Sequence, residues 1–201
     1  MVLVSRLTEG FIVKHILFTV GLLGLLVAPL AWSTDWQSAP EVSVLNFAPS
    51  YEGLPINGEF SEFSVSYTTG KDGQPKALTV SVLVASADLG NRDLNTEIRA
   101  ADWFNIADFP RAIFSCQKFT QDEKGNVLAH GDLQIKGYSR PVTVPFSWQT
   151  SSTGQALMKG DLALGRNHFF IGSDEWASGN QIGLAVKVQF DVVLNSVNAS
   201  L

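Results

Sequence analysis

The chain has 201 residues, of which 45% are hydrophobic and 16% are charged, and its net charge is -5 at pH 7. This amount of apolar material supports one sizeable core, which excludes a mainly disordered chain and favours one domain. The acidic balance argues against a nucleic-acid surface, because such a surface needs clustered Lys and Arg side chains to neutralise phosphates.

The first 33 residues have the layout of a secretory signal peptide. Basic residues precede an uncharged, leucine-rich run at 16–31, which is short for a membrane span. Small residues at Ala31 and Ser33 suit a signal peptidase site, so we expect cleavage after Ser33 and a mature domain over residues 34–201. An uncleaved signal anchor is the alternative, and both alternatives predict an exported domain.

Apolar residues alternate with polar or small ones through most of the remaining chain, which predicts antiparallel β-strands. The longest run extends from Ile182 to Leu194, with every second residue apolar. Turn signals such as Asp72-Gly73 and Gly125-Asn126 separate the runs. The pattern predicts eight strands, at residues 41–48, 54–68, 76–85, 111–120, 127–136, 141–150, 155–165 and 181–195.

Three segments depart from this alternation. The apolar phase changes between Phe60 and Phe63, which predicts a bulge or a sharp bend in the second strand. Asp93 is followed by apolar residues at helical spacing, which predicts a short helix capped by Asp93. Residues 169–181 are rich in Gly, Ser and Asn and predict a long loop that places Trp176 on or into the domain.

Eight half-buried antiparallel strands favour a closed barrel, because closure removes both exposed sheet edges. The predicted fold is therefore all-β, an eight-stranded antiparallel barrel with one short helix. The interior of such a barrel is just wide enough for one slender ligand. A two-sheet sandwich is the competing architecture, and periodicity alone does not separate the two.

No combination of residues predicts a catalytic or metal site. His130 lies on a solvated strand face and His168 begins a loop, so these histidines do not suggest a metal centre. The single Cys116 is interpreted as a small buried side chain. Arg92 lies between two aspartates and is interpreted as ordering a turn, although Arg92, Asp93 and His168 are the residues that an enzyme would use.

Three motifs resemble those of YceI-like proteins. The stretch at 102–114 resembles the family's Asp-aromatic-Phe, Tyr/Phe-Pro and Phe signature. Residues 131–142 are similar to its Gly-x-Leu-x-x-x-Gly-x-Thr-x-Pro-Val block, with Ser139 in place of Thr. Gly58-Glu59-Phe60 followed by Phe63 resembles its Gly-x-Phe-x-x-Phe strand, and the resemblance extends from about residue 42 to 194.

Two further stretches refine the resemblance. Residues 166–176 are similar to the branch of the family that also occurs fused to cytochrome b561-type membrane domains. The family's Arg-Asp-x-His-Leu-Arg-Ser run appears as Arg92-Asp93 without its histidine, so no role of that histidine transfers to this chain.

The resemblance implies a lipocalin-like barrel in the periplasm that encloses a long isoprenoid lipid, such as a polyprenyl quinone or a related amphiphile. It implies neither catalysis nor a required cofactor or metal, and the expected partners are the isoprenoid lipid and, transiently, the inner membrane or a membrane redox protein. Strand phase and family position together predict the residues that line the interior. These are Phe47, Ile56, Phe60, Leu78, Val80, Val82, Ile98, Trp103, Phe104, Phe114, Leu133, Val142, Phe146, Phe169 and Trp176.

The main alternative is an interaction or stress-response accessory module whose barrel has a closed core. Exposure of Phe169, Phe170 and Trp176 together on one rim would favour that alternative.

Overall fold

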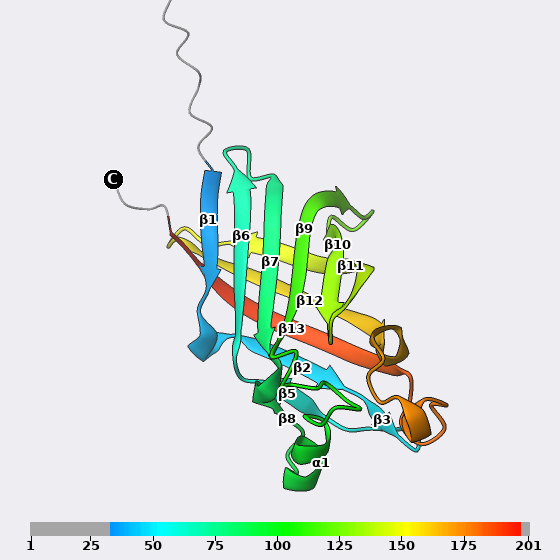
Figure 1. The fold of residues 1–201 in the computed structure, drawn as a ribbon. Helices are drawn as coiled ribbons and strands as arrows, with labels where there is room; N and C mark the ends of the chain where they lie inside the picture. The colour runs from blue at the N-terminus through cyan, green and yellow to red at the C-terminus, as the bar shows by residue number, and fades with distance from the viewer. Residues whose placement is uncertain (1–32, 198–201) are drawn as a thin grey trace, which may run out of the picture. The chain divides into compact units, whose positions relative to one another are not determined.

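The alternating segments pair into one antiparallel sheet within residues 33–197, the part of the chain that the computed structural model describes (Figure 1). The predicted signal peptide lies outside these residues, except for Ser33. The strand order is β1-β6-β7-β9-β10-β11-β12-β13-β2-β5-β8, and β1 also pairs with β13. The strands of this sheet are β1 (Ser33–Ser38), β2 (Val44–Ala48), β5 (Gly58–Phe60), β6 (Phe63–Gly70), β7 (Pro75–Leu83), β8 (Ala87–Asp88), β9 (Arg111–Gln121), β10 (Val127–Ile135), β11 (Tyr138–Thr150), β12 (Gln155–Gly165) and β13 (Ala185–Ser196).

The sheet closes into an eight-stranded barrel because β1 pairs with both β6 and β13. Trp36 of β1 lies opposite Tyr67 on one side and Ser196 on the other. The eleven strands make eight barrel strands because three barrel strands consist of two segments each. These are β1 with β2, β5 with β6, and β7 with β8. The β2–β5 pairing continues the β1–β6 pairing, and the β5–β8 pairing continues the β6–β7 pairing. The predicted eight-stranded antiparallel barrel is confirmed, and the sandwich alternative is excluded.

The strand boundaries show where alternation was misleading. Strand β1 was not predicted, because Trp36 is the only buried residue in its sequence STDWQS. The predicted first strand instead begins as a 3₁₀ turn, η1 (Pro40–Val42), and continues as β2. The phase change after Phe60 corresponds to a bend at residues 61–62 that separates β5 from β6, so the predicted bend is confirmed.

The predicted short helix is present as α1 (Arg92–Glu97), but its cap is not Asp93. The side-chain oxygen of Asn91 accepts hydrogen bonds from the backbone N–H groups of Asp93 and Leu94, at 2.9 and 3.1 Å. Asp93 is the second residue of the helix and lies in its first turn, where its negative charge complements the helix N-terminus. The preceding turn is ordered by Asp88, which accepts from Gly90 N and Asn95 Nδ2 and whose pKa these bonds lower.

The two ends of the barrel differ in their connections. Short turns at residues 71–74, 122–126 and 151–154 join strands at one end, which we call the turn end. The other end, which we call the loop end, holds the β3–β4 hairpin, α1 and three 3₁₀ turns. The loop-end elements are β3 (Ser50–Tyr51), β4 (Leu54–Pro55), η2 (Val84–Ser86), α1, η3 (Arg166–Phe169) and η4 (Asp174–Trp176), together with the β10–β11 turn at 136–137.

Aromatic side chains fill the interior toward the turn end. The Tyr67 ring centroid lies 4.7 Å from that of Trp148, 5.8 Å from Phe146 and 6.3 Å from Phe119. Trp36 packs edge-on against Trp148 at 5.2 Å. These rings meet inside the barrel, so this part of the interior is solid. Because the barrel closes and carries its own core within residues 33–197, this segment has the features of an independently folding domain.

Candidate functional site

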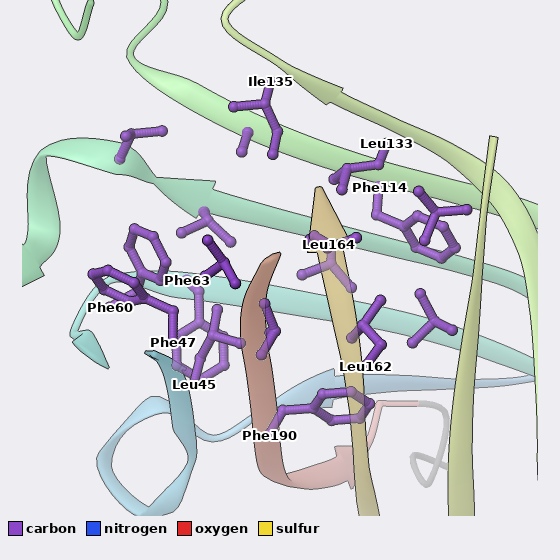
Figure 2. A pocket seen from close by; sticks show the side chains of 18 of the residues that line it. Leu45, Phe47, Phe60, Phe63, Phe114, Leu133, Ile135, Leu162, Leu164 and Phe190 are labelled. Carbon is purple, nitrogen blue, oxygen red and sulfur yellow. The ribbon is translucent and has the colours of Figure 1, made fainter. Parts of the chain in front are cut away.

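An apolar cavity of about 220 Å³ lies inside the barrel, between the aromatic layer and the loop end. Figure 2 shows Leu45, Phe60, Leu133 and Phe190 projecting into it from different strands. Every residue that lines the cavity is apolar except Arg166. An apolar cavity of roughly 150 Å³ already stays dry and admits a small apolar ligand. The barrel is therefore hollow toward the loop end and solid toward the turn end.

All but two of the predicted lining residues lie in the cavity wall. They are Phe47, Phe60, Leu78, Val80, Val82, Ile98, Trp103, Phe104, Phe114, Leu133, Val142, Phe146 and Phe169. The prediction is wrong in placing Ile56 and Trp176 there. Ile56 follows the β3–β4 hairpin, where its N–H donates to Pro49 O at 2.8 Å. Trp176 packs against Trp103, with ring centroids 6.3 Å apart, and does not reach the cavity. Contact of the wall residues with a ligand stays a prediction.

The prediction missed much of the wall on β12 and β13. Val186, Val188, Phe190 and Val192 line the cavity and belong to the strongest alternating run in the sequence. The same phase on β12 brings in Met158, Leu162 and Leu164. The alternation alone could therefore have predicted that these residues face the interior. The remaining wall residues that the prediction missed are Leu45, Pro49, Phe63, Val65, Val84, Leu89, Ala112, Ile135, Val144, Arg166 and Ile171.

Apolar side chains from the loops cover the cavity at the loop end. The Phe47 and Phe60 rings lie 4.7 Å apart, and Phe104 approaches Phe60 at 6.4 Å. On the other side, Trp103 and Phe169 are buried together in one apolar cluster. These residues come from different segments, so the cover depends on how the loops pack on one another.

Arg166 organises the largest of these loops. Its side chain is 3% exposed, and its guanidinium donates all five of its N–H groups to backbone carbonyls. The distances are 3.0 Å to Gly183, 2.8 Å to both Ile171 and Gly172, 2.5 Å to Trp176 and 2.7 Å to Ile182. Burial lowers the pKa of Arg166 from its ordinary value. The saturated guanidinium offers no free donor to a ligand.

The three loop aromatics that would mark an interaction module are not exposed together. Phe169 is 2% exposed and Trp176 is partly buried, whereas Phe170 is 49% exposed. Phe170 stacks on Tyr138 with ring centroids 4.5 Å apart. Of the three residues that the interaction-module alternative expects to be exposed on one rim, only Phe170 is exposed.

The residues that an enzyme would use lie outside the cavity wall. Arg92, Asp93 and His168 are exposed, on α1 and η3. His130 bonds Thr120 and Thr143 on the neighbouring strands, at 2.8 and 3.0 Å, as expected for a structural histidine.

Clusters of metal-ligating side chains and membrane-spanning helices are both absent from residues 33–197. No group of three or more His, Cys, Asp or Glu side chains in this part of the chain could hold a metal ion. No helix within these residues is long and apolar enough to cross a membrane. Cys116 is buried as a free thiol, as expected, and burial raises its pKa.

The chain is similar to known proteins over most of its length. The family model described as the YceI-like domain matches residues 36–194. Protein YceI from Escherichia coli O157:H7 is 28% identical over 134 residues, which cover 61% of this chain and 69% of that protein.

Solved structures share the fold. Burkholderia cenocepacia BcnA has a TM-score of 0.73 at 24% identity, covering 78% of this chain and 98% of the BcnA chain. A polyisoprenoid binding domain from Saccharophagus degradans, implicated in plant cell wall breakdown, has a TM-score of 0.64 at 16% identity. The similarity covers 80% of this chain and 98% of that domain.

Proposed function

The chain belongs to the YceI-like domain family, and on this premise we propose that it is a periplasmic carrier that encloses the tail of an isoprenoid lipid. The observation that carries the proposal is the cavity of about 220 Å³, whose wall is apolar except for Arg166. The polyisoprenoid-binding domain of similar fold supports this choice of ligand class. The signal-like pattern of residues 1–33 supports export by a cleaved signal peptide.

Transfer free energies favour an isoprenoid tail in this cavity. Burying one CH₂ group is worth about 0.8 kcal/mol, so each five-carbon unit contributes roughly 3–4 kcal/mol on leaving water. A bilayer offers the tail nearly the same surroundings, so transfer from membrane to barrel is close to neutral. This balance suits a carrier that exchanges its ligand and not a trap that retains it.

The wall selects for the tail and not for the head group. All five N–H groups of Arg166 already serve backbone carbonyls, and the Trp103 indole N–H donates to Glu97 at 3.1 Å. A buried polar head would therefore find no donor in the wall, at a cost of a few kcal/mol. A polyprenyl quinone or related amphiphile fits if its head stays at the loop end.

We assign no covalent chemistry to the chain itself. Arg92, Asp93 and His168 are exposed and do not line the cavity, so they lie apart from an enclosed ligand. The similarity of residues 166–176 to the branch fused to cytochrome b561-type domains supports a membrane redox protein as the partner that receives or supplies a quinone.

The test is mass spectrometry of an organic extract from the chain purified without detergent from its periplasmic fraction. We expect an isoprenoid lipid in near-stoichiometric amount. The blocking variant is Val80→Phe, which adds bulk inside the cavity, and the matched control is Thr79→Phe, which adds the same ring on the outward face of β7.

Val80→Phe should lose most of the lipid, and Thr79→Phe should keep it. Reproducible absence of lipid from the unmodified chain would contradict the proposal, as would equal loading of both variants. Unfolding curves of the two variants identify any loss that results from misfolding. N-terminal sequencing of the same preparation tests the proposed cleavage, which predicts Thr34 as the first residue.

A further inference from the structure

One buried hydrogen-bond donor at the loop end has no acceptor. Among the side-chain nitrogen and oxygen atoms of residues 33–197, Nε of Arg99 is the one that is buried without a hydrogen-bond partner. The neighbouring Nη2 of the same guanidinium donates to Ala87 O, at 3.3 Å. A buried N–H group without an acceptor is unfavourable, so native structures contain few of them, and each one requires a physical explanation.

Arg99 lies where the barrel wall is interrupted. Strand β8 pairs with β5 on one side, and the β7–β9 ladder ends at the pair of Leu83 and Arg111. On the other side of β8, no strand within the described residues continues the sheet. The carbonyl of Ala87 accepts there from Arg99, so the guanidinium covers the free edge of β8. We call this place, between β8 and residues 98–110, the seam.

The seam borders the cavity. Ala87 is fully buried and forms one apolar cluster with Phe47 and Ile98. Both Phe47 and Ile98 line the cavity, and Arg99 directly follows Ile98 in the chain. The cavity-lining residues that pack against this cluster are Phe60, Leu89 and Phe104. A lipid whose tail fills the cavity would therefore hold its head group at this border.

Other donors beside the cavity already have acceptors. All five N–H groups of Arg166 serve backbone carbonyls, and the indole N–H of Trp103 has its own carboxylate acceptor. The backbone N–H of Leu89 donates to Asn95 Oδ1, at 2.7 Å. The Nε atom of Arg99 is thus the donor that remains for an oxygen atom of a ligand.

The charges around the seam favour an uncharged head group. The pKa of Asp88 is lowered by hydrogen bonds from Asn95 and Gly90, and the nearby charge of Arg99 adds to this effect. The other charged residues on the segments around the seam are the acidic Glu59, Glu62, Asp93, Glu97, Asp102 and Asp108 and the basic Arg92, Arg111 and Lys187. Because carboxylates predominate, a phosphate or carboxylate head group would be repelled. A carbonyl oxygen can accept from Nε of Arg99 without adding a negative charge.

We propose that Nε of Arg99 binds the head group of the enclosed lipid at the seam, through an uncharged oxygen such as the carbonyl of a quinone ring. This inference rests on the proposed function and adds the contact that selects the head group. The apolar tail lies in the cavity, and the ring lies between β8 and residues 98–110.

Competition between isoprenoids that differ in their head groups tests this contact. The chain is freed of lipid on a hydrophobic resin and incubated with equal amounts of squalene, geranylgeranyl phosphate and a geranylgeranyl benzoquinone. Mass spectrometry then measures the ligands that it retains. The test variant is Arg99→Met, which keeps an unbranched side chain but removes every donor. The matched control is Arg92→Met, at an exposed arginine of α1.

We expect the unmodified chain to retain more quinone than phosphate. Arg99→Met should lower the ratio of quinone to squalene by about tenfold, and Arg92→Met should leave this ratio unchanged. Arg99→Lys keeps the charge but has no donor at the position of Nε, so it should lose the preference for quinone as Arg99→Met does. Retention of squalene by each variant shows that its cavity is intact.

The possible outcomes separate this contact from lipid enclosure. An unchanged ratio of quinone to squalene in Arg99→Met would overturn the head-group contact. Equal loss of both ligands would also overturn it, because Arg99 would then only hold the cover of the cavity in place. A quinone preference that Arg99→Lys retains would assign the effect to charge and overturn the role of Nε, and a preference for the phosphate would overturn the uncharged head. Failure of the unmodified chain to retain any of the three ligands would contradict the proposed function itself.

Discussion

The guanidinium of Arg166 lies over the indole ring of Trp103, with its central carbon 5.7 Å from the ring centroid. Both residues line the cavity, and they come from segments more than sixty positions apart. Gly172 completes the contact, because a Cβ atom there would meet Nη1 of Arg166 at 2.6 Å and the Trp103 ring at 3.1 Å. The buried cation thus joins the 166–183 loop to the turn that follows α1.

Replacing Arg166 with Lys should unfold this corner of the barrel. Lysine keeps the charge but lacks the planar fork that reaches five carbonyls, so several buried acceptors lose their donors. We expect a decrease of about 3 kcal/mol in the free energy of unfolding, with faster hydrogen exchange at residues 171–183. Urea denaturation and exchange mass spectrometry measure both effects.

The matched control for this prediction is Arg140→Lys, at an arginine near the surface whose guanidinium lies 5.8 Å from the centroid of the Tyr138 ring. Its Nη1 bonds only the neighbouring Ser139 O, at 2.8 Å, so the change should cost less than about 1 kcal/mol. Equal stability of Arg166→Lys and the unmodified chain would show that the hydrogen bonds to the loop contribute little.

Strand phase was enough to predict antiparallel strands and most of one side of the cavity, although it did not separate a barrel from a sandwich. Leu78, Val80 and Val82 alternate along β7, and all three line the cavity. The same rule applied to Val186 and Val188 would have found the opposite side. Period-two alternation defines which residues share a face, and closure of the sheet then decides that the shared face points inward.

The loop end could not be predicted in this way. The position of Trp176 depends on packing against Trp103, and the course of its loop depends on hydrogen bonds from Arg166, which lies ten positions earlier. No periodic pattern encodes such contacts. Strand β1 was missed for a related reason, since its pairing with β13 joins residues at opposite ends of the domain.

The buried Tyr67 should make the barrel sensitive to alkaline pH. Burial, with a smaller effect from Cys116, raises the pKa of its phenol above the ordinary value of about 10. Above about pH 10 the unfolded chain loses this proton while the native chain keeps it, so the free energy of unfolding falls by up to about 1.4 kcal/mol per pH unit. Urea denaturation at about pH 9 and about pH 11 should show this loss, and Tyr67→Phe should reduce it.

The control for the pH prediction is Tyr51→Phe, which removes a phenol from the exposed β3–β4 hairpin. If Tyr67→Phe and Tyr51→Phe lost the same free energy between the two pH values, burial of Tyr67 would not explain the alkaline response.

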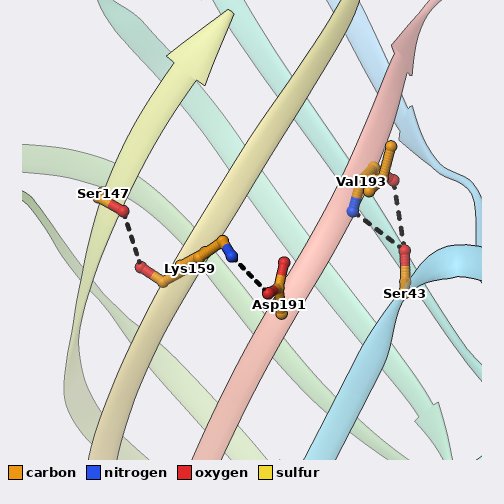
Figure 3. A network of polar contacts seen from close by, with 5 residues as sticks. All are labelled: Ser43, Ser147, Lys159, Asp191 and Val193. Atoms are coloured by element: carbon orange, nitrogen blue, oxygen red, sulfur yellow. Dashed lines mark hydrogen bonds and ion pairs between the residues drawn. The ribbon is translucent and has the colours of Figure 1, made fainter.

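Ser43 should stabilise the barrel more than the nearby surface ion pair. Its Oγ accepts a hydrogen bond from Val193 N at 3.1 Å, at the gap where β13 changes partner from β2 to β1 (Figure 3). Ser43→Ala removes this acceptor and should cost about 1–2 kcal/mol. Lys159 Nζ lies 2.6 Å from Asp191 Oδ2, but both side chains are about half exposed. Lys159→Gln should therefore lower the free energy of unfolding by less than about 1 kcal/mol. The reverse order in thermal unfolding would contradict this assignment.

Gly160 should control the volume of the cavity through Phe190. The two residues pair across β12 and β13. A Cβ atom at Gly160 would meet the carbonyl oxygen of Pro145 most closely and Cζ of the Phe190 ring at 2.5 Å, and of these two groups the ring is the one that can move. Because that ring lines the cavity, Gly160→Ala should push it inward and cost about 1–3 kcal/mol in stability, with less lipid in the organic extract.

A double-mutant cycle measures whether Phe190 carries this effect. Phe190→Leu shortens the side chain over Gly160, so Gly160→Ala should cost less in the Phe190→Leu background than in the unmodified chain. A coupling free energy of about 1 kcal/mol or more is expected for residues in direct contact. Additive costs would mean that the added methyl group acts elsewhere, and the carbonyl of Pro145, on the neighbouring strand β11, is the other group it would meet.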